Sequence, residues 1–244
     1  MIFSGKSDVG KRRANNQDNF NITELAGGAC LLTVCDGMGG AKGGNVASGI
    51  ACSVYTETVC RGYSAEEPHN TALLKEAVTA ANTAVYEAAM ADEALKGMGT
   101  TLVSALVTPD GRVSVVNVGD SRLYALLGCE LKQVTHDHSY VQYLVDMGQI
   151  TMKEAKTASI RNIIIRSVGN EAETTPDLFS LSLGEGAYLL LCSDGLTNCV
   201  ANDVLATTIR AEDQAALDHC AETLIALANE GGGIDNITVV LAKI

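Results

Sequence analysis

The sequence is short of basic residues and lacks both long apolar runs and paired-cysteine motifs, and each absence excludes a class of protein. Lys and Arg number 17 against 29 Asp and Glu, which gives 244 residues a formal charge of −12. Binding to nucleic acid or to an acidic membrane surface needs a basic face. No apolar run approaches the ~20 residues that a membrane-spanning helix requires. The composition predicts a soluble protein with neither a nucleic-acid nor a membrane partner.

The N-terminus and the cysteines predict a cytoplasmic location. Residues 1–10 lack a basic segment followed by an apolar one, so no secretory leader is expected. The eight cysteines form no Cys-x-x-Cys pair, and several stand inside apolar runs. We expect them to be reduced thiols that act as small core hydrophobes. The four histidines do not cluster with the cysteines, so zinc is not the expected metal.

The apolar content, 47%, is enough for a substantial core. Short apolar stretches with strand character occupy residues 29–35, 101–107, 112–118, 122–127, 188–192 and 236–242. The second and third are joined by Pro109-Asp110-Gly111, a turn that predicts an antiparallel hairpin. Helical periodicity covers residues 43–60, 70–92 and 211–229, and a shorter piece follows Ser139 to about Met147.

Strands and helices are segregated along the chain rather than alternating, which predicts an α+β fold with helices packed on antiparallel sheet. The sequence has no linker rich in Pro or Ser, no internal repeat and no low-complexity tract. We therefore expect residues 1–244 to form one domain.

Four aspartates stand where an apolar run gives way to a small or polar residue: Asp36, Asp120, Asp194 and Asp235. A carboxylate at the end of a buried strand costs free energy unless a cation neutralises it. If several such strand ends converge, their carboxylate oxygens form a site that suits Mg²⁺ or Mn²⁺. Asp-Gly is also a common turn, and Asp110 is interpreted as a turn residue only. Spacing alone does not establish that the four carboxylates meet.

Two further segments could lie at such a site. Residues 7–18 concentrate basic and amide side chains in an acidic chain. An arginine there could clamp phosphate oxygens beside a metal, and the alternative is an ordinary solvated loop. The glycine-rich stretch 37–44 lacks the Gly-Lys-Ser/Thr ending of a nucleotide-binding loop. Its glycines are expected to let the backbone approach a ligand and then turn into a helix.

Six motifs in this order resemble the metal-dependent Ser/Thr protein phosphatases of the 2C type, in their compact bacterial form. They are RANNQD at 13–18, DGMGG at 36–40, GTT at 99–101, GDSR at 119–122, SDGL at 193–196 and DN at 235–236. The resemblance extends from residue 7 to residue 238. It implies a sandwich of two antiparallel β-sheets flanked by antiparallel α-helices, four layers in the order αββα, with a small flap at about 137–169.

The resemblance also implies a metal site. By match to the family motifs, Asp36 bridges two Mn²⁺ or Mg²⁺ ions and the Gly37 carbonyl adds a ligand. Asp194 and Asp235 complete that pair. Asp120 matches the aspartate that holds a third, weaker ion.

Other matched residues surround the ions. Arg13 corresponds to the arginine that binds the substrate phosphate, and Asp18 to the aspartate that orients the attacking water. Gln17 and Asn236 belong to the same outer layer. The implied reaction is direct in-line attack of a water activated by two metal ions, with no protein nucleophile.

The sequence departs from the family pattern at several places. Met38 stands where some relatives have a histidine, so the source of the leaving-group proton is open. His136 and His138 are weak candidates for that role, and a structural role near the flap is favoured. In the flap, Ala158-Ser159 replace a usual His-Pro pair, while Asn45, Gln17 and Asn198 stand where relatives often have acids. None of these changes removes an expected metal ligand.

Three functions compete. The first is an active phosphatase of phosphoserine and phosphothreonine, whose partners are phosphorylated proteins, a bacterial Ser/Thr kinase and that kinase's targets. The second is a catalytically silent member that binds phosphoproteins, which the intact set of aspartates disfavours. The third is another metal hydrolase or cation-binding module on the same fold. A monomer is the default expectation.

Overall fold

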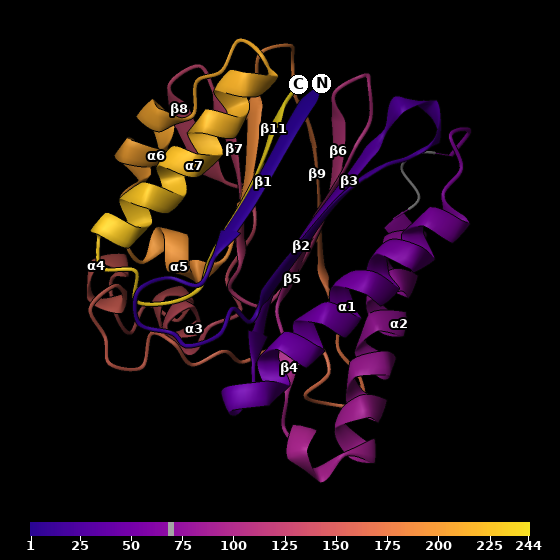
Figure 1. Ribbon diagram of the computed structural model, residues 1–244, viewed down its shortest axis with the longest axis vertical. Coiled ribbons are helices and arrows are strands. Elements are labelled where there is room, and N and C mark those ends of the chain that lie inside the picture. The colour runs from indigo at the N-terminus through magenta and orange to yellow at the C-terminus, as the bar shows by residue number, and fades with distance from the viewer. Residues whose placement is uncertain (68–70) are drawn as a thin grey trace.

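The computed structural model describes residues 1–67 and 71–244, and its strands form two antiparallel sheets packed face to face (Figure 1). The first sheet has the order β1 (Ile2–Asp8), β11 (Ile237–Lys243), β10 (Tyr188–Cys192), β7 (Arg122–Leu127) and β8 (Glu130–Gln133). The second has the order β2 (Asp18–Glu24), β3 (Cys30–Met38), β5 (Leu102–Val107), β6 (Arg112–Val118) and β9 (Asp177–Ser182), and β4 (Gly99–Thr100) pairs with the end of β3.

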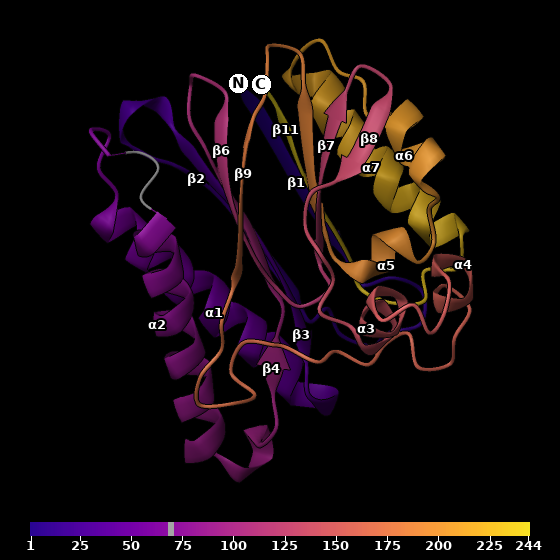
Figure 2. The same ribbon diagram turned by 180° about the vertical axis from the view of Figure 1, so that it is seen from behind.

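Helices cover the outer face of each sheet, as both ribbon views show (Figures 1 and 2). The long pair α1 (Gly40–Gly62) and α2 (Thr71–Ala91) lies on the second sheet. The group α5 (Asp194–Thr197), α6 (Asn202–Thr208) and α7 (Gln214–Glu230) lies on the first. Two short helices, α3 (Tyr140–Asp146) and α4 (Met152–Ala155), lie within residues 137–169, the segment that is expected to form a flap and is called the flap below. The predicted αββα sandwich is confirmed.

The layers arise because alternate residues of the strands enter different apolar cores. In β3, Leu32 and Val34 pack between the two sheets, whereas Leu31 and Cys35 pack against α1 and α2. A strand that is buried on both faces is apolar at every position rather than alternately. Burial of each such side chain stabilises the fold by about 1.5–3 kcal/mol.

The predicted elements agree with the structure except at their ends. The hairpin at residues 109–111 is confirmed, with Val107 opposite Val113 in the β5–β6 register. Helix α7 begins after Asp213 rather than at 211, because the Asp213 carboxylate caps the helix by accepting a hydrogen bond from the Ala216 amide at 2.8 Å. The second predicted helix was to start at Asn70, which lies outside the described residues together with His69.

Five strands of the described chain were not predicted: β1, β2, β4, β8 and β9. Strand β1 carries few large apolar residues, and its place is set by seven paired positions with β11. Strand β9 is an edge strand with every second residue exposed. Such strands depend on their neighbours in the sheet more than on their own pattern.

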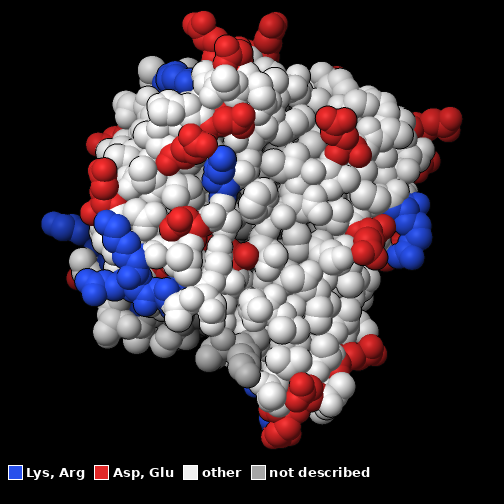
Figure 3. Space-filling view, in the orientation of Figure 1, with Lys and Arg blue, Asp and Glu red and all other residues white. Residues whose placement is uncertain are grey.

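The surface agrees with the acidic composition, with one exception. On the face in Figure 3, acidic side chains are scattered, whereas Lys and Arg gather where Figure 1 places α4 and the loop between β1 and β2. Among the described residues, no helix has the length and apolar character that crossing a membrane demands. All eight cysteines are free thiols, and most of them are buried.

Candidate active site

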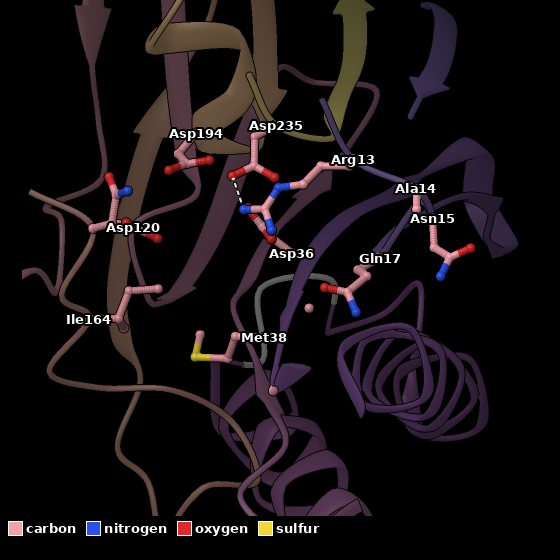
Figure 4. Close-up of a pocket in the computed structure, with 13 residues that line it drawn as sticks. Arg13, Ala14, Asn15, Gln17, Asp36, Met38, Asp120, Ile164, Asp194 and Asp235 are labelled. Atoms are coloured by element: carbon pink, nitrogen blue, oxygen red, sulfur yellow. Dashed lines mark hydrogen bonds and ion pairs between the residues drawn. The ribbon is translucent and has the colours of Figure 1, made fainter. Parts of the chain in front are cut away.

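A cavity of about 480 Å³ lies where loops and strand ends from both sheets meet, and most of the predicted site residues line it (Figure 4). Asp18 and Asn236 are not among its lining residues. Asp36 comes from β3, Asp120 from the turn between β6 and β7, Asp194 from the start of α5 and Asp235 from the loop before β11. Arg13, on the loop between β1 and β2, completes the set. The structure therefore brings together four carboxylates and one arginine that are far apart in the sequence.

The backbone of Asp36 is fixed by the Gly-Thr-Thr motif. The Asp36 amide donates to Thr101 Oγ1 at 2.9 Å, and its carbonyl accepts from the Thr101 amide at 2.8 Å and from Thr100 Oγ1 at 2.9 Å. Strand β3 continues through Asp36 to Met38, so the expectation that the strand ends before Asp36 is wrong. The pairing with β4 extends the strand and holds this carboxylate on regular backbone.

Asp18 lies directly opposite Asp36 in the register of β2 and β3. Its Oδ2 accepts hydrogen bonds from Ser193 Oγ and Thr238 Oγ1, each at 2.7 Å. Its Oδ1 is buried and has no hydrogen-bond partner among the described residues. A hydroxyl of β11 and one directly after the end of β10 thus orient a carboxylate of the second sheet.

Asp194 and Asp235 line the cavity where the end of β10 lies beside the start of β11. A side chain at Gly195 would collide with the Asn236 carbonyl, because an added Cβ would lie 2.0 Å from it. Glycine therefore permits the close approach that puts both aspartates on the cavity. Asn198 Nδ2 donates to Asp194 Oδ2 at 3.0 Å, and Asp194 Oδ1 is buried without a partner in the described chain.

Asp120 follows Gly119, whose φ of +107° suits only glycine. The Gly119 amide donates to His138 Nδ1 at 3.0 Å, and the His138 amide donates to the Gly119 carbonyl at 3.0 Å. The other ring nitrogen, Nε2, lies 2.9 Å from Arg166 Nη1 and 3.2 Å from Asp177 Oδ2. Burial lowers the pKa of His138, which favours the neutral ring.

The loop that carries Arg13 is tied to the start of β11. Asn236 Nδ2 donates to the carbonyls of Val9 and Asn15 at 2.9 and 3.0 Å, and its Oδ1 accepts from the Gln17 amide at 2.9 Å. Arg13 Nη2 donates to Asp235 Oδ2 at 2.7 Å, as the dashed line in Figure 4 marks. Asn236 is thus a positioning residue for the loop, and Arg13 is aimed into the cavity.

The carboxylates strongly disfavour their own ionisation. Burial, with repulsion from Asp18 next in size, raises the pKa of Asp36 well above its usual range. Burial and the Asp194 charge raise the pKa of Asp120 to about 8. Burial also raises the pKa of Asp194 to about 6, with Asp235 as the next cause, and that of Asp18 to about 6. A cation in the cavity would remove this penalty.

The donor set suits divalent cations. Carboxylate oxygens are the ligands that Mg²⁺ and Mn²⁺ prefer. Oδ1 of Asp194, which has no hydrogen-bond partner among the described residues, could bind such a cation. Within residues 1–67 and 71–244, however, no three acidic, His or Cys side chains are already clustered so as to hold an ion. The carboxylates line one space, and one oxygen of Asp235 is engaged by Arg13.

The flap borders this cavity through Asn162 and Ile164. Its two ends are joined at the base by a bridge between Ser139 and Ile164 and by the Ile165 amide, which donates to the His138 carbonyl at 2.9 Å. His136 is exposed and contacts Asp146 of α3 at 2.8 Å. Neither His136 nor His138 lines the cavity, in agreement with the structural role favoured for them.

Several residues of the site were not identified from the sequence. Ser193 and Thr238 orient Asp18, and Asn198 contacts Asp194. Asn198 had been noted only as a departure from an acidic position. Hydroxyl and amide side chains are so common at strand ends that no pattern singles these out.

Comparison with known proteins gives one consistent family. Residues 7–231 match the family model described as protein phosphatase 2C. The protein phosphatase PhpP of Streptococcus pneumoniae is 36% identical over 247 residues, which cover 100% of this chain and 97% of PhpP. The crystal structure of the serine/threonine phosphatase Stp1 from Staphylococcus aureus is 36% identical, with a TM-score of 0.92 over 100% of this chain and 95% of that one. The catalytic domain of PstP, solved in complex with 2 manganese ions, is also 36% identical, with a TM-score of 0.85 over 99% and 96% of the two chains.

Proposed function

Because the chain belongs to the protein phosphatase 2C family, we propose that it is a metal-dependent hydrolase of phosphoserine and phosphothreonine monoesters in proteins. The observation that carries this function is the cavity in which Asp36, Asp120, Asp194 and Asp235 face one arginine. The carboxylates supply a site for cations, and Arg13 supplies a fork for phosphoryl oxygens.

The residues assigned to the metal are the buried carboxylates. We assign Asp36 as the residue shared by two Mn²⁺ or Mg²⁺ ions, with the Gly37 carbonyl, Asp194 and Asp235 as the other ligands. Asp120 is assigned to a third, weaker ion. Support comes from the raised pKa values, the partnerless oxygen of Asp194 and the manganese ions bound by PstP. Bound in this way, the ions supply an activated water and neutralise phosphoryl charge.

The protein's own groups bind and orient the substrate. Arg13 turns from Asp235 to the phosphoryl oxygens and stabilises their charge in the transition state. Asp18, which two hydroxyls hold on the strand position opposite Asp36, orients the attacking water from behind the metal ligands. Asn198 fixes the rotamer of Asp194, and Gln17 and Asn236 hold the loop that bears Arg13.

Met38 lines the cavity and cannot donate a proton. No histidine lines the cavity, among the residues that the structure describes. We therefore propose that the leaving serine or threonine oxygen takes its proton from water rather than from an imidazole.

We further propose that residues 1–244 act as one catalytic domain with a flap at 137–169, as a monomer in the cytoplasm. The eight free thiols support a reducing compartment. The substrates are proposed to be a Ser/Thr protein kinase and the proteins that it phosphorylates.

The direct test is release of phosphate from an aryl phosphate and from phosphothreonine peptides in the presence of Mn²⁺ or Mg²⁺, with a chelator control. We expect turnover that the chelator abolishes. A folded protein that shows no turnover with either metal would reject the proposal. Calorimetric titration of Mn²⁺ into the protein and into Asp194→Asn would then distinguish an active phosphatase from a silent phosphoprotein binder. The metal affinity of a phosphatase depends on Asp194, whereas that of a silent binder need not. Preference for phosphodiesters would favour another metal hydrolase.

A further inference from the structure

A second cavity, of about 570 Å³, adjoins the first, and Asp120, Asn162 and Asp194 line both. Its other walls include α3, α4 with the segment that follows it, Arg122 and Gln133 of β7 and β8, and residues 197–202, from the end of α5 to the start of α6. We name it the flap cavity. The hydrolytic step uses only the first cavity, so the flap cavity is available to another part of the substrate.

Two cations on the flap side of the flap cavity, Lys156 and Arg161, form no ion pair with any side chain that the structure describes. The ion pairs found among the described side chains involve other Lys and Arg residues. Arg122 also lines the flap cavity, but Asp137 binds it through contacts of 2.6 and 3.0 Å and compensates its charge. In a chain with a net charge of −12, two uncompensated cations facing one cavity indicate an anionic ligand.

The other charges of the flap cavity do not cancel these cations once the proposed metal ions are bound. Its remaining acids are Asp120 and Asp194, which are the proposed ligands of those ions, and Asp137, which is paired with Arg122. The flap cavity also offers apolar contacts from Val141, Ala155 and Val200, against which the methylene part of a side chain can pack.

We infer that the flap cavity binds a second anionic side chain of the protein substrate, a phosphate or a carboxylate, close in sequence to the residue being dephosphorylated. This inference rests on the proposed function. In an extended peptide, side chains two positions apart point the same way and are about 7 Å apart, which suits two cavities that share a wall. A phosphate is preferred to a carboxylate because its two charges and three oxygens engage both Lys156 and Arg161.

The test uses phosphothreonine peptides that are identical except for one residue, which stands two positions before or two positions after the phosphothreonine. The variable residue is Gln, Glu, Lys or a non-hydrolysable phosphonate analogue of phosphoserine. We expect kcat/KM to rise about threefold from Gln to Glu and about tenfold from Gln to the phosphonate, on at least one side. The double variant Lys156→Gln/Arg161→Gln should bring both ratios close to one. Lys156→Glu should shift the preference toward the Lys peptide.

Lys153→Gln is the matched control, because Lys153 is exposed on α4, three residues before Lys156, but does not line the flap cavity. It should keep the ratios, and so should Lys11→Gln/Arg12→Gln, which alters only the general field around the first cavity. Equal kcat/KM for all peptides, or ratios that survive the Lys156/Arg161 double variant, would overturn the inference while leaving the phosphatase activity intact. Absence of hydrolysis for every peptide would instead reject the proposed function itself. Calorimetric binding of a peptide with phosphonates at both positions gives a readout that does not depend on turnover.

Discussion

The carboxylate site and the flap lie next to each other but are built in opposite ways. Asp36 and Asp18 stand on paired strands whose neighbours are buried in the sandwich, and hydrogen bonds from both sheets fix them. The flap has two short helices, and several of its large apolar side chains are exposed, among them Tyr143, Met152 and Ile165. The buried carboxylates Asp36 and Asp18 therefore stand on the firmly packed part of the molecule, and the exposed apolar side chains on the lightly packed part.

The largest effect is expected where the rigid part meets the metal. Asp36→Ala should lower kcat/KM by at least about 1,000-fold, because it removes the shared ligand. Folding should persist, since the change also relieves repulsion with Asp18 across the strand pair. Steady-state kinetics and circular dichroism measure the two effects. Asp110→Ala is the control, because Asp110 also precedes a glycine but belongs to the hairpin turn. Near-normal turnover of Asp36→Ala would refute the bridging assignment.

Arg13→Ala tests the proposed phosphate-binding residue, which lies on the loop between β1 and β2. The change should lower kcat/KM about 100-fold, chiefly through weaker substrate binding. Mn²⁺ affinity measured by calorimetry should not fall, because the guanidinium that competes for Asp235 is gone. Its exposed neighbour provides a control in Arg12→Ala. A rise in turnover with unchanged KM would contradict the assignment.

Metal removal should make the stability of the sandwich depend on pH. The pKa of Asp120 is raised to about 8 and those of Asp18 and Asp194 to about 6, so the folded state holds protons that the unfolded chain releases near pH 4. Stability therefore falls as the pH rises from about 4 through 8. With chelator, thermal unfolding at pH 8 should occur several degrees lower than at pH 5, and Mn²⁺ should abolish the difference. A chelated protein that is equally stable at both pH values would contradict the assigned carboxylate burial.

His138 connects the carboxylate site to the flap, because it exchanges two hydrogen bonds with Gly119, the residue before Asp120. His138→Phe leaves the Gly119 amide without its acceptor, so we expect a loss of about 1–3 kcal/mol in the free energy of unfolding and faster hydrogen exchange across the flap. His138→Asn, whose oxygen can accept from the same amide, should recover part of the loss. Equal stability of wild type and His138→Phe in chemical denaturation would show that the hydrogen bond between Gly119 and His138 does not contribute to the free energy of unfolding.

The smallest effect should come from the flap alone. Thr151 and Glu154 form a capping box at the start of α4, in which the Thr151 amide donates to Glu154 Oε2 at 2.7 Å. Thr151→Ala should cost about 1 kcal/mol, confined to α4. Hydrogen exchange of residues 152–155 should speed up while hydrolysis of an aryl phosphate changes less than twofold. Global destabilisation would mean that the flap is more firmly joined to the sandwich than its packing indicates.

Features with a local sequence pattern could be predicted from the sequence, whereas features set by tertiary contacts could not. The buried strands and amphipathic helices were predictable because apolar periodicity reports burial directly, as in β3 and α7. The strand-end aspartates were found, but their convergence followed only from the resemblance, because pairings such as that between Asp18 and Asp36 join segments through the sheet register. Strands β1 and β9 and the contact of Asn198 with Asp194 depend on tertiary neighbours and leave no local signal.

The ion pair between Arg13 and Asp235 links two binding events in one equilibrium. A carboxylate occupied by a guanidinium has less affinity for a cation, and a guanidinium held by a carboxylate has less for phosphate. Whatever captures Asp235 therefore liberates Arg13, and thermodynamic reciprocity requires that phosphate bound to Arg13 tighten metal binding by the same factor. The protein would thus recognise phosphate strongly only after it has been loaded with metal, an order of assembly encoded in a single 2.7 Å contact.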